Sequence, residues 1–423
     1  MRSAGHQEAF SKRLIMNDIP LLARASNIDQ SGIAQESNAS VLVLKGGTVY
    51  ASPGAVPLVD ATLTIANGVI IGIAERAAAP LAGNSKIIDC SGMFVLAGFQ
   101  NNHMHFSEPL WADARNMPSA ELEATLNSSI SRFGFTTVVD AGSVLSNTLA
   151  LRSRIRAGDV SGPRILTAGH PLFPVNGVPH YLKSCLRCEV LDSLERPGSP
   201  EEAVERVRAN ISAGADFVKL FTGSWVDVDE IKPMRVDVAT AAVEEAHRLG
   251  KLVYTHPSNV LGLKIALLAR VDVLAHAVED MRDWNPLYLA RLKALDGAMI
   301  PTLTLYRDDE WLEDILRQVK EYSRLGGQIL FGTDMGYTPI SDPTQEYILM
   351  RRAGLSFSQI LASLTTEPAD RFCESQVRGK LACGVDADLV VLDEDPQKDI
   401  EALAAVRFTI RRGEVIYSRA TDG

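Results

Sequence analysis

The chain has 423 residues, of which 46% are hydrophobic and 22% are charged, and its formal net charge is -10. This composition is typical of a globular protein, and because no apolar run reaches the roughly 20 residues of a membrane span, we expect a soluble chain without a membrane partner. The negative net charge offers no basic surface for a polyanion, so nucleic acid is excluded as an expected partner and a small molecule is favoured.

Residues 1–40 are mixed and polar without a sustained hydrophobic period, and we interpret them as an N-terminal extension of low order or as a short docking helix. They lack the continuous apolar core of a signal peptide, because proline and polar residues interrupt the segment 15–20. The five cysteines are an odd and sparse set, unlike a disulfide framework, so we expect a cytoplasmic protein. Cys185 and Cys188 have a spacing that can bind zinc or act in redox chemistry. No second pair completes such a site, and we interpret them as an incidental loop pair.

Short β-type runs separated by glycine and asparagine begin at Val41. They cover residues 41–49, 61–71 and 86–89, and runs of the same character return at 387–393 and 408–417. We predict that residues 41–93 and 377–423 pair into one small β-sandwich domain. The segment 94–376 is then an insertion between the two parts of this domain.

The inserted segment alternates between apolar and helical stretches. Eight apolar runs are strand candidates, at residues 94–99, 136–140, 165–168, 217–220, 252–255, 271–275, 299–302 and 329–332. Helical stretches such as 201–207 and 238–246 separate them. Continuous apolar runs are typical of parallel strands buried on both faces, and eight β–α repeats are the number of a closed barrel. The predicted fold is therefore α/β, with a (β/α)8 TIM-like barrel at 94–376 inserted into the β-sandwich domain.

Side chains that can bind metal ions follow several of these runs. His103 and His105 come after the first run, His256 and His276 after the fifth and sixth, and Asp334 after the eighth. Alternate residues of a strand share a face, so the first two histidines can grip one metal ion. The first and eighth strands of a barrel are neighbours, which predicts Asp334 beside this pair. The other two histidines, on neighbouring strands, can hold a second ion.

Lys219 is the last residue but one of the fourth run, where an ammonium group facing a metal site would be repelled. Burial beside cations lowers the pKa of a lysine and leaves a neutral amine that can react with carbon dioxide. The resulting carbamate is an anion that can bridge two metal ions. The alternative interpretation is a surface lysine at a strand end.

The ordered set of these motifs resembles the amidohydrolase superfamily of metal-dependent hydrolases, specifically its imidazolonepropionase-like and prolidase-like branch. The resemblance covers about residues 41–420. It includes the segment 92–99 before the paired histidines, 134–140 on the second run, 214–219 up to the lysine, and 384–392 near the C-terminus.

The resemblance implies a site with two divalent metal ions. His103, His105 and Asp334 would bind the more buried ion, His256 and His276 the more exposed one, and carboxylated Lys219 both. Zinc is the ion expected for imidazole and carboxylate ligands in a hydrolase, although manganese or cobalt can substitute. Members of this family often pair, so a homo-oligomer is a further expectation.

The resemblance also implies a mechanism. A hydroxide held between the metal ions attacks a carbonyl carbon polarised by the outer ion, because metal binding lowers the pKa of water to roughly 7. Asp334 takes the proton of the hydroxide and passes it to the leaving group. His180, in a long loop after the third run, is a candidate donor to the developing oxyanion, or alternatively a solvated loop histidine.

Loops after the strands build the substrate pockets of such barrels. The candidate pocket residues, each of which can alternatively be packing or surface, are His180, Tyr181, Trp225, Tyr254, Arg307 and Tyr337. Among them, Arg307 is the candidate to bind a substrate carboxylate through paired hydrogen bonds. Tyr254 precedes His256 by two residues and can equally belong to the barrel interior.

The leading hypothesis is a binuclear metallohydrolase that cleaves a C–N amide bond in a small molecule, such as an N-acyl amino acid, a dipeptide or an amide-containing toxin or xenobiotic. Residues 221–227 and Asn259 depart from the pattern of the peptide-cleaving members, which argues against a simple dipeptidase. Opening of a cyclic amide is the nearest alternative, although relatives with that chemistry often use one metal ion and lack the lysine. Lactone or phosphotriester hydrolysis stays open. A non-catalytic assembly protein on the same fold is a remote alternative, because every ligand position is filled here.

Overall fold

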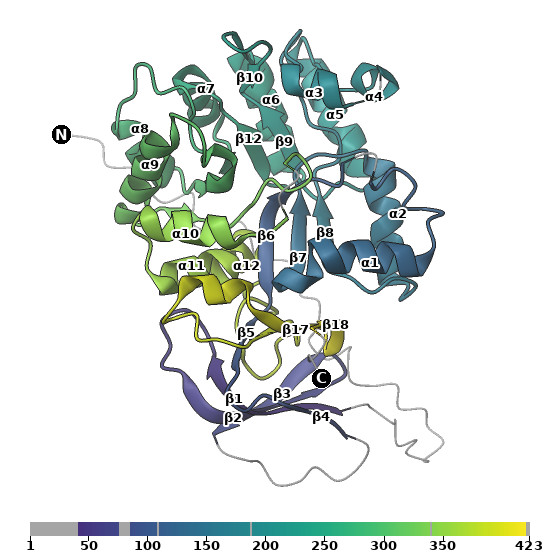
Figure 1. Cartoon of the computed structure of the whole chain (residues 1–423). Coiled ribbons are helices and arrows are strands. Elements are labelled where there is room, and N and C mark those ends of the chain that lie inside the picture. Colours follow the sequence, from purple (N-terminus) through teal and green to yellow (C-terminus); the bar gives the residue numbers. More distant parts are fainter. Residues whose placement is uncertain (1–40, 76–84, 108–109, 187, 339–340, 420–423) are drawn as a thin grey trace, which may run out of the picture. The chain divides into compact units, whose positions relative to one another are not determined.

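The computed structural model describes residues 41–75, 85–107, 110–186, 188–338 and 341–419, so the expected extension 1–40 lies outside the described residues. Both ends of the described chain contribute to one sheet (Figure 1). Its order is β18-β17-β16-β5-β1-β2-β3, and β4 pairs with β1. The strands are β1 (Val41–Tyr50), β2 (Leu58–Ala66), β3 (Val69–Glu75), β4 (Ser85–Asp89), β5 (Phe94–Ala97), β16 (Leu389–Leu392), β17 (Val406–Arg411) and β18 (Glu414–Ser418). The predicted pairing of the chain ends is thus present in this sheet, whereas a two-layered sandwich stays a prediction.

A tight turn explains why the run 61–71 forms parts of two strands. Asn67 and Gly68 have φ values of 53° and 76°. A two-residue hairpin turn needs this left-handed conformation, which asparagine and glycine adopt most readily. The turn lets Leu63 of β2 and Ile70 of β3 join the same buried hydrophobic cluster.

Two parallel sheets lie between the chain ends in sequence. The first has the order β6-β7-β8 and the second the order β15-β14-β13-β12-β9. Their strands are β6 (Phe99–Met104), β7 (Phe135–Asp140), β8 (Arg164–Thr167), β9 (Val218–Phe221), β12 (Val253–His256), β13 (Val273–Ala275), β14 (Ala298–Ile300) and β15 (Gln328–Ile329). Backbone hydrogen bonds also run between the two groups: Leu172 N donates to Lys219 O over 2.9 Å, and Asn102 N donates to Phe331 O over 2.8 Å. The chain is therefore of the α/β class.

Helices alternate with these strands along the chain (Figure 1). They are α1 (Ser119–Ser129), α2 (Leu145–Arg156), α3 (His180–Cys185), α4 (Cys188–Asp192), α5 (Pro200–Ala213), α6 (Val236–Arg248), α7 (Val260–Ala269), α8 (Leu287–Ala294), α9 (Leu312–Arg324), α10 (Thr344–Arg352), α11 (Phe357–Leu364) and α12 (Thr366–Arg371). The remaining described elements are three short 3-10 turns and a small hairpin. The turns are η1 (Ser131–Phe133), η2 (Leu303–Tyr306) and η3 (Ile400–Ala404), and the hairpin consists of β10 (Gly223–Trp225) and β11 (Ile231–Pro233). Within the described parts of the chain, none of the helices has the length and apolar character needed to cross a membrane.

Helix α5 shows how local sequence sets the helix ends. The Ser199 side chain accepts a hydrogen bond from the backbone N–H of Glu202, and Pro200 occupies the first turn, where a missing N–H costs nothing. Gly214 ends the helix in the left-handed conformation, with φ of 114°. The predicted helical stretch 201–207 lies within this helix and is confirmed.

Two of the eight predicted strands differ from the observed ones. The run 94–99 is divided, because β5 pairs with β1 and β16 in the sheet of the chain ends, whereas β6 begins at Phe99. At Gly98, between them, a Cβ atom would lie 2.3 Å from Oγ1 of Thr136, so the backbone passes too close to β7 for any side chain. The run 329–332 contributes only Ile329 to β15, since Phe331 instead accepts a hydrogen bond from the backbone of β6.

Successive parallel strands share one small buried cluster, whose members are Val139, Leu166, Ala168, Phe217, Tyr254, Val273, Ala275, Ala298, Ile300 and Leu330. Lys219 and His256 come two residues after the cluster members Phe217 and Tyr254. Because alternate residues of a strand share a face, these two polar side chains continue the face of the cluster toward the carboxyl ends of the strands. The apolar cluster therefore supports the layer of polar residues that follows it.

Candidate metal centre and active-site cavity

His103, His105 and Asp334 converge at the carboxyl end of β6. His103 lies on this strand and is fully buried, and His105 is the first residue after the strand. The Nε2 atoms of the two histidines lie 3.2 and 3.0 Å from Oδ1 of Asp334. A parallel bridge between Met104 and Met335 holds the two segments side by side. The structure thus places Asp334 beside the histidine pair, as the strand order of a barrel predicts.

The backbone around Asp334 is held in an unusual conformation. Gly336 has φ of 96°, and a Cβ atom there would lie 2.0 Å from the carbonyl oxygen of His105, so only glycine permits this approach. Asp334, His276 and Thr302 also have positive φ values, of 56°, 86° and 47°. Non-glycine residues adopt this conformation only where the surrounding structure fixes it, which is common at functional sites.

His276 lies between the other histidines. Its ring centroid is 4.6 Å from that of His103 and 4.5 Å from that of His256. Potential ligand atoms of His103, His276 and Asp334 all lie within 4.8 Å of one another. The expected grouping put His276 only with His256, whereas the structure brings its ring about as close to His103 and its ligand atom within 4.8 Å of one of Asp334.

Hydrogen bonds select the tautomers of two of these histidines. Nδ1 of His105 lies 2.6 Å from the carbonyl oxygen of Gly142, which can only accept, so Nδ1 carries the proton and Nε2 keeps its lone pair. Nδ1 of His276 lies 2.6 Å from Oγ1 of Thr302. This hydroxyl donates to the carbonyl oxygen of Pro301 over 2.8 Å and therefore accepts from His276. In both rings Nε2 is left as the metal-binding atom, an arrangement typical of metal ligands.

Lys219 is 1% exposed, and its Nζ lies 5.3 Å from the centre of the Phe221 ring. Burial lowers the pKa of its amine from 10.5 to about 7, and the charge of Asp334 opposes this only in part. Burial and the charge of Lys219 likewise lower the pKa of His103 to about 3. The alternative interpretation of a surface lysine is therefore wrong. An amine and an imidazole without their extra protons are the forms that react with carbon dioxide and bind metal ions.

Several buried polar atoms of this cluster have no hydrogen-bond partner among the residues that the structure describes. They are Nδ1 and Nε2 of His103, Nε2 of His256 and Oδ1 of Asp334; the short distances between histidines and Asp334 lack the angles of hydrogen bonds. Burial alone would raise the pKa of the Asp334 carboxyl, but the charge and contact of His103 hold it well below its usual value. Buried imidazole nitrogens and a carboxylate oxygen that lack hydrogen-bond partners are a donor set that fits divalent metal ions such as zinc.

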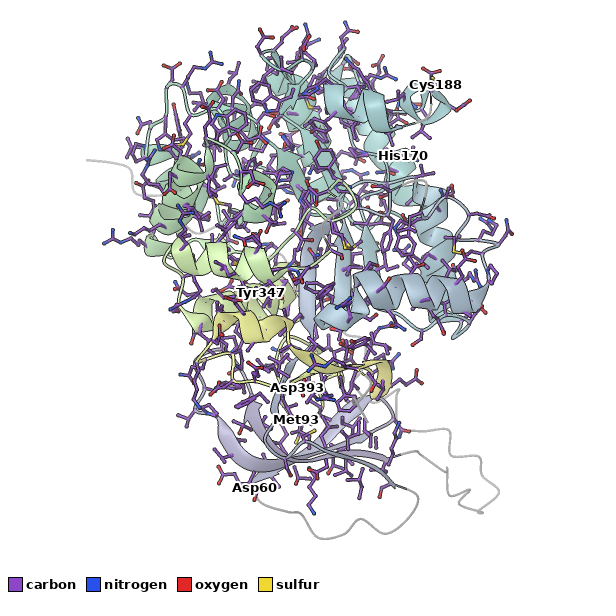
Figure 2. The ribbon with its side chains drawn as sticks, viewed as in Figure 1. Asp60, Met93, His170, Cys188, Tyr347 and Asp393 are labelled. Atoms are coloured by element: carbon purple, nitrogen blue, oxygen red, sulfur yellow. The ribbon has the colours of Figure 1, made fainter. Side chains whose placement is uncertain are left out.

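A cavity of about 590 Å³ opens onto this cluster. The cavity lining includes all six ligand candidates, which are His103, His105, Lys219, His256, His276 and Asp334. It also includes four residues of the expected substrate pocket, which are His180, Tyr181, Trp225 and Tyr337. His170, after β8, also lines it (Figure 2). The structure therefore brings ten of the twelve residues chosen from the sequence to one cavity.

Two expected pocket residues lie elsewhere. Tyr254 is fully buried among the core residues, with its ring centroid 4.6 Å from that of Phe217, and does not line the cavity. Its side chain shares the strand face of His256 but lies one layer deeper. Arg307 does not line the cavity either, and its Nε pairs with Oδ2 of the exposed Asp308 at 3.0 Å. The expected roles of Tyr254 in the pocket wall and of Arg307 in carboxylate binding are therefore corrected.

The incidental loop pair is tested only in part. Cys188 is a free, exposed cysteine on α4 (Figure 2). The side chain of Cys185 lies outside the described residues.

Sequence reasoning missed three residues of the site. Glu279 is buried in the cavity wall. Its carboxylate accepts one hydrogen bond from Tyr306 Oη over 2.8 Å and one from the indole nitrogen of Trp225. Its Oε1 also lies 3.5 Å from His256 Nε2. Thr302 orients His276, and Trp311 stacks on Trp225. Glu279 follows His276 by three residues, but no motif spacing marks an acid at that position. Its partners come from other loops.

The model of the amidohydrolase family matches residues 94–416. This is more than half of the chain, and the chain therefore belongs to the amidohydrolase family. It is an enzyme that hydrolyses carbon–nitrogen bonds.

Individual relatives are distant in sequence and close in fold. The chain is 24% identical to the ochratoxinase of Aspergillus niger over 412 residues, which cover 87% of this chain and 84% of that protein. The crystal structure of A. niger ochratoxinase has a TM-score of 0.74 at 19% identity, with 90% of this chain and 96% of that chain covered. A Xaa-Pro dipeptidase with bound methionine gives 0.75 at 21% identity, covering 90% and 100%. Phenylurea hydrolase B gives 0.74 at 21% identity, covering 89% and 96%.

Proposed function

We propose that the chain is a binuclear metal-dependent amidohydrolase that cleaves a C–N amide bond of a small molecule. The observation that carries the proposal is the presence of a buried lysine amine, Lys219, in the same cavity wall as four histidines and Asp334. A buried ammonium beside these imidazoles is costly, whereas a neutral or carboxylated amine beside metal ions is not.

The proposal includes a closed (β/α)8 barrel at about residues 94–376, inserted into a β-sandwich domain of residues 41–93 and 377–423. Its support is the number of parallel strands and the hydrogen bonds at both junctions between the two parallel sheets. At one junction Phe221 N donates to Leu172 O over 3.0 Å, and at the other His105 N donates to Met335 O over 2.8 Å. A barrel places the ligands from all strands at one rim.

The six ligand candidates would hold two divalent metal ions, for which zinc is the expected element. His103, His105 and Asp334 would serve one ion and His256 the other. His276 lies near both groups of ligands and could serve either ion. The neutral amine of Lys219 would attack carbon dioxide at carbon. A new N–C bond forms, one proton leaves to water, and the product is a carbamate anion that can bind both ions.

Bound metal ions would supply Lewis-acid polarisation of the substrate carbonyl and a water molecule acidic near pH 7. Asp334, whose pKa is held low by His103, is an ionised carboxylate that would accept a proton and release it to the leaving nitrogen. His180, at the start of α3 and in the cavity wall, would donate to the carbonyl oxygen as negative charge develops there.

The names of similar proteins support small-molecule substrates. An ochratoxinase, a Xaa-Pro dipeptidase and a phenylurea hydrolase are each named for a small compound. We extend this general class to the present chain, without adopting any one of those substrates. A cytoplasmic location and a homo-oligomer stay predictions.

Metal analysis tests the proposal. Purified protein dialysed against zinc is expected to retain two equivalents per chain and to hydrolyse members of a panel of aryl amides, N-acyl amino acids, dipeptides and lactones. The Lys219→Ala variant should lose both the carbamate bridge between the metal ions and turnover. The Lys293→Ala variant, which alters an exposed lysine of α8, should retain both. Carbon-13 bicarbonate should give a carbamate signal in the parent protein and in Lys293→Ala but not in Lys219→Ala. A folded parent protein that binds no zinc would refute the proposal.

A further inference from the structure

The cavity wall away from the metal-ligand cluster is mainly aromatic and aliphatic. Trp225 at the end of β10 and Trp311 before α9 stack with ring centroids 5.8 Å apart and an interplanar angle of 14°. Tyr181 and Tyr337 form a second ring pair at 4.9 Å. Aliphatic lining is supplied mainly by α3 and the segment after it, with Leu182, Leu186, Val190 and Leu194. Such a surface favours a flat apolar group.

Glu279 fixes this aromatic wall. One oxygen of its carboxylate accepts a hydrogen bond from the Trp225 indole, and the other accepts one from Tyr306 Oη over 2.8 Å. Because the carboxylate is buried and bonds both donors, it sets the rotamer of Trp225 against Trp311. The wall is therefore a preorganised surface rather than a loose set of side chains.

The charges in this wall are negative. Beyond the six ligand candidates, the charged side chains among the described lining residues are Glu279 and Asp309, with His170 and His180 as the remaining ionisable bases. The described lining contains no arginine. Arg307, the candidate from the sequence, pairs with Asp308 outside the cavity. Among the described residues of this wall, a substrate carboxylate would meet two like charges and no guanidinium.

We propose that the group bound by this wall is an uncharged aromatic ring, so that the enzyme selects neutral N-aryl or arylalkyl amides and ureas and discriminates against substrates that carry a carboxylate. The inference rests on the proposed function and adds the substrate class. The aromatic pair supplies the attraction, and Glu279 with Asp309 supplies the repulsion that excludes anionic analogues.

Matched substrate pairs test this selectivity. Acetanilide is compared with 4-acetamidobenzoate, and N-acetylphenethylamine with N-acetylphenylalanine, each pair differing by one carboxylate. We expect kcat/KM of the neutral member to be roughly tenfold higher or more in at least the pair whose ring reaches the wall. Equal or faster turnover of both carboxylated members would overturn the proposal and point to an anion site.

A charge variant separates repulsion from simple shape. Asp309→Asn is expected to reduce the ratio of neutral to carboxylated turnover by about threefold, a modest factor because Asp309 lies at the exposed end of the cavity. Glu310→Gln removes the same charge one residue away, at an exposed position that does not line the cavity, and should leave the ratio unchanged. An unchanged ratio in Asp309→Asn would refute the electrostatic part of the inference.

Binding is measured separately so that the two proposals can fail independently. Calorimetric titration of acetanilide and 4-acetamidobenzoate into inactive Lys219→Ala, shown to be folded by circular dichroism, reports on the wall without hydrolysis. Preference for the neutral compound with no turnover in the zinc-loaded parent would sink the hydrolase proposal and retain the selectivity. Preference for the carboxylate would sink the selectivity alone.

Discussion

Replacing Lys219 by methionine is expected to stabilise the metal-free protein while it abolishes function. The amine is buried, and its pKa falls from 10.5 to about 7 mainly because burial penalises the charged form. A fall of this size corresponds to a free-energy penalty on the order of 5 kcal/mol for holding the protonated lysine in the folded state. Methionine has a similar length and no charge to desolvate, so it removes this penalty.

The sign of the effect follows from proton binding. Between pH 7 and pH 10.5 the unfolded chain binds more protons at Lys219 than the folded chain, so the stability of the parent protein rises with pH over this window. The penalty is complete below pH 7 and disappears above pH 10.5. The stability advantage of Lys219→Met should therefore be largest near pH 6 and small near pH 10. Groups away from the Lys219 amine titrate alike in both proteins and cancel in the difference.

Urea unfolding of chelator-treated proteins, followed by circular dichroism at pH 6 and pH 9, measures this difference. At pH 6 the variant should unfold at a higher urea concentration, and its free energy of unfolding should exceed that of the parent by several kcal/mol. This difference in free energy should become smaller at pH 9. Lys293→Met, at an exposed site on α8, should behave as the parent at both values. A Lys219→Met variant that is no more stable than the parent at pH 6 would refute the reasoning that burial sets the state of this amine.

Two further predictions concern the support of the metal ligands. Thr302→Val removes the hydrogen-bond partner of Nδ1 of His276 and is expected to weaken zinc binding about tenfold in competition with a chelator, whereas Thr302→Ser should retain the affinity; equal affinities for Val and Ser would contradict this role. Gly336→Ala would place a Cβ atom 2.0 Å from the carbonyl oxygen of His105 and should lower the free energy of unfolding by roughly 3 kcal/mol or more. Gly326→Ala is the matched control, because Gly326 has φ of 70° with open space around it and should lose only about 1 kcal/mol. Equal losses at both glycines in urea unfolding would show that the contact with His105 is unimportant.

Local sequence sets the features that depend on neighbouring residues, although the run 61–71 was expected as one β-type segment and forms parts of two strands. Helix α5 begins and ends at its serine cap and at Gly214, and the hairpin of β2 and β3 turns at Asn67 and Gly68, because capping and turn geometry are set within a few residues. The ligand candidates were also accessible. Each lies at or just after the end of an apolar run, and parallel strands put such positions at the same edge.

The tertiary structure alone decided how these side chains meet. The division of 94–99 at Gly98 depends on the close approach of Thr136, and the place of His276 beside both His103 and His256 depends on packing between separate strands. Such contacts are set by strand register and backbone approach, which no short stretch of sequence encodes.

The cavity wall shows the same division most clearly. The sequence singled out Trp225 and Tyr181 as aromatic residues in loops, but could not show that Trp311 stacks on the first or that Glu279 holds it in place. Arg307 looked suited to a carboxylate because of its chemistry, yet the fold turns it to Asp308. The kind of chemistry follows from which residue types end the strands, whereas selectivity follows from which loops face one another, and that is a property of the folded chain.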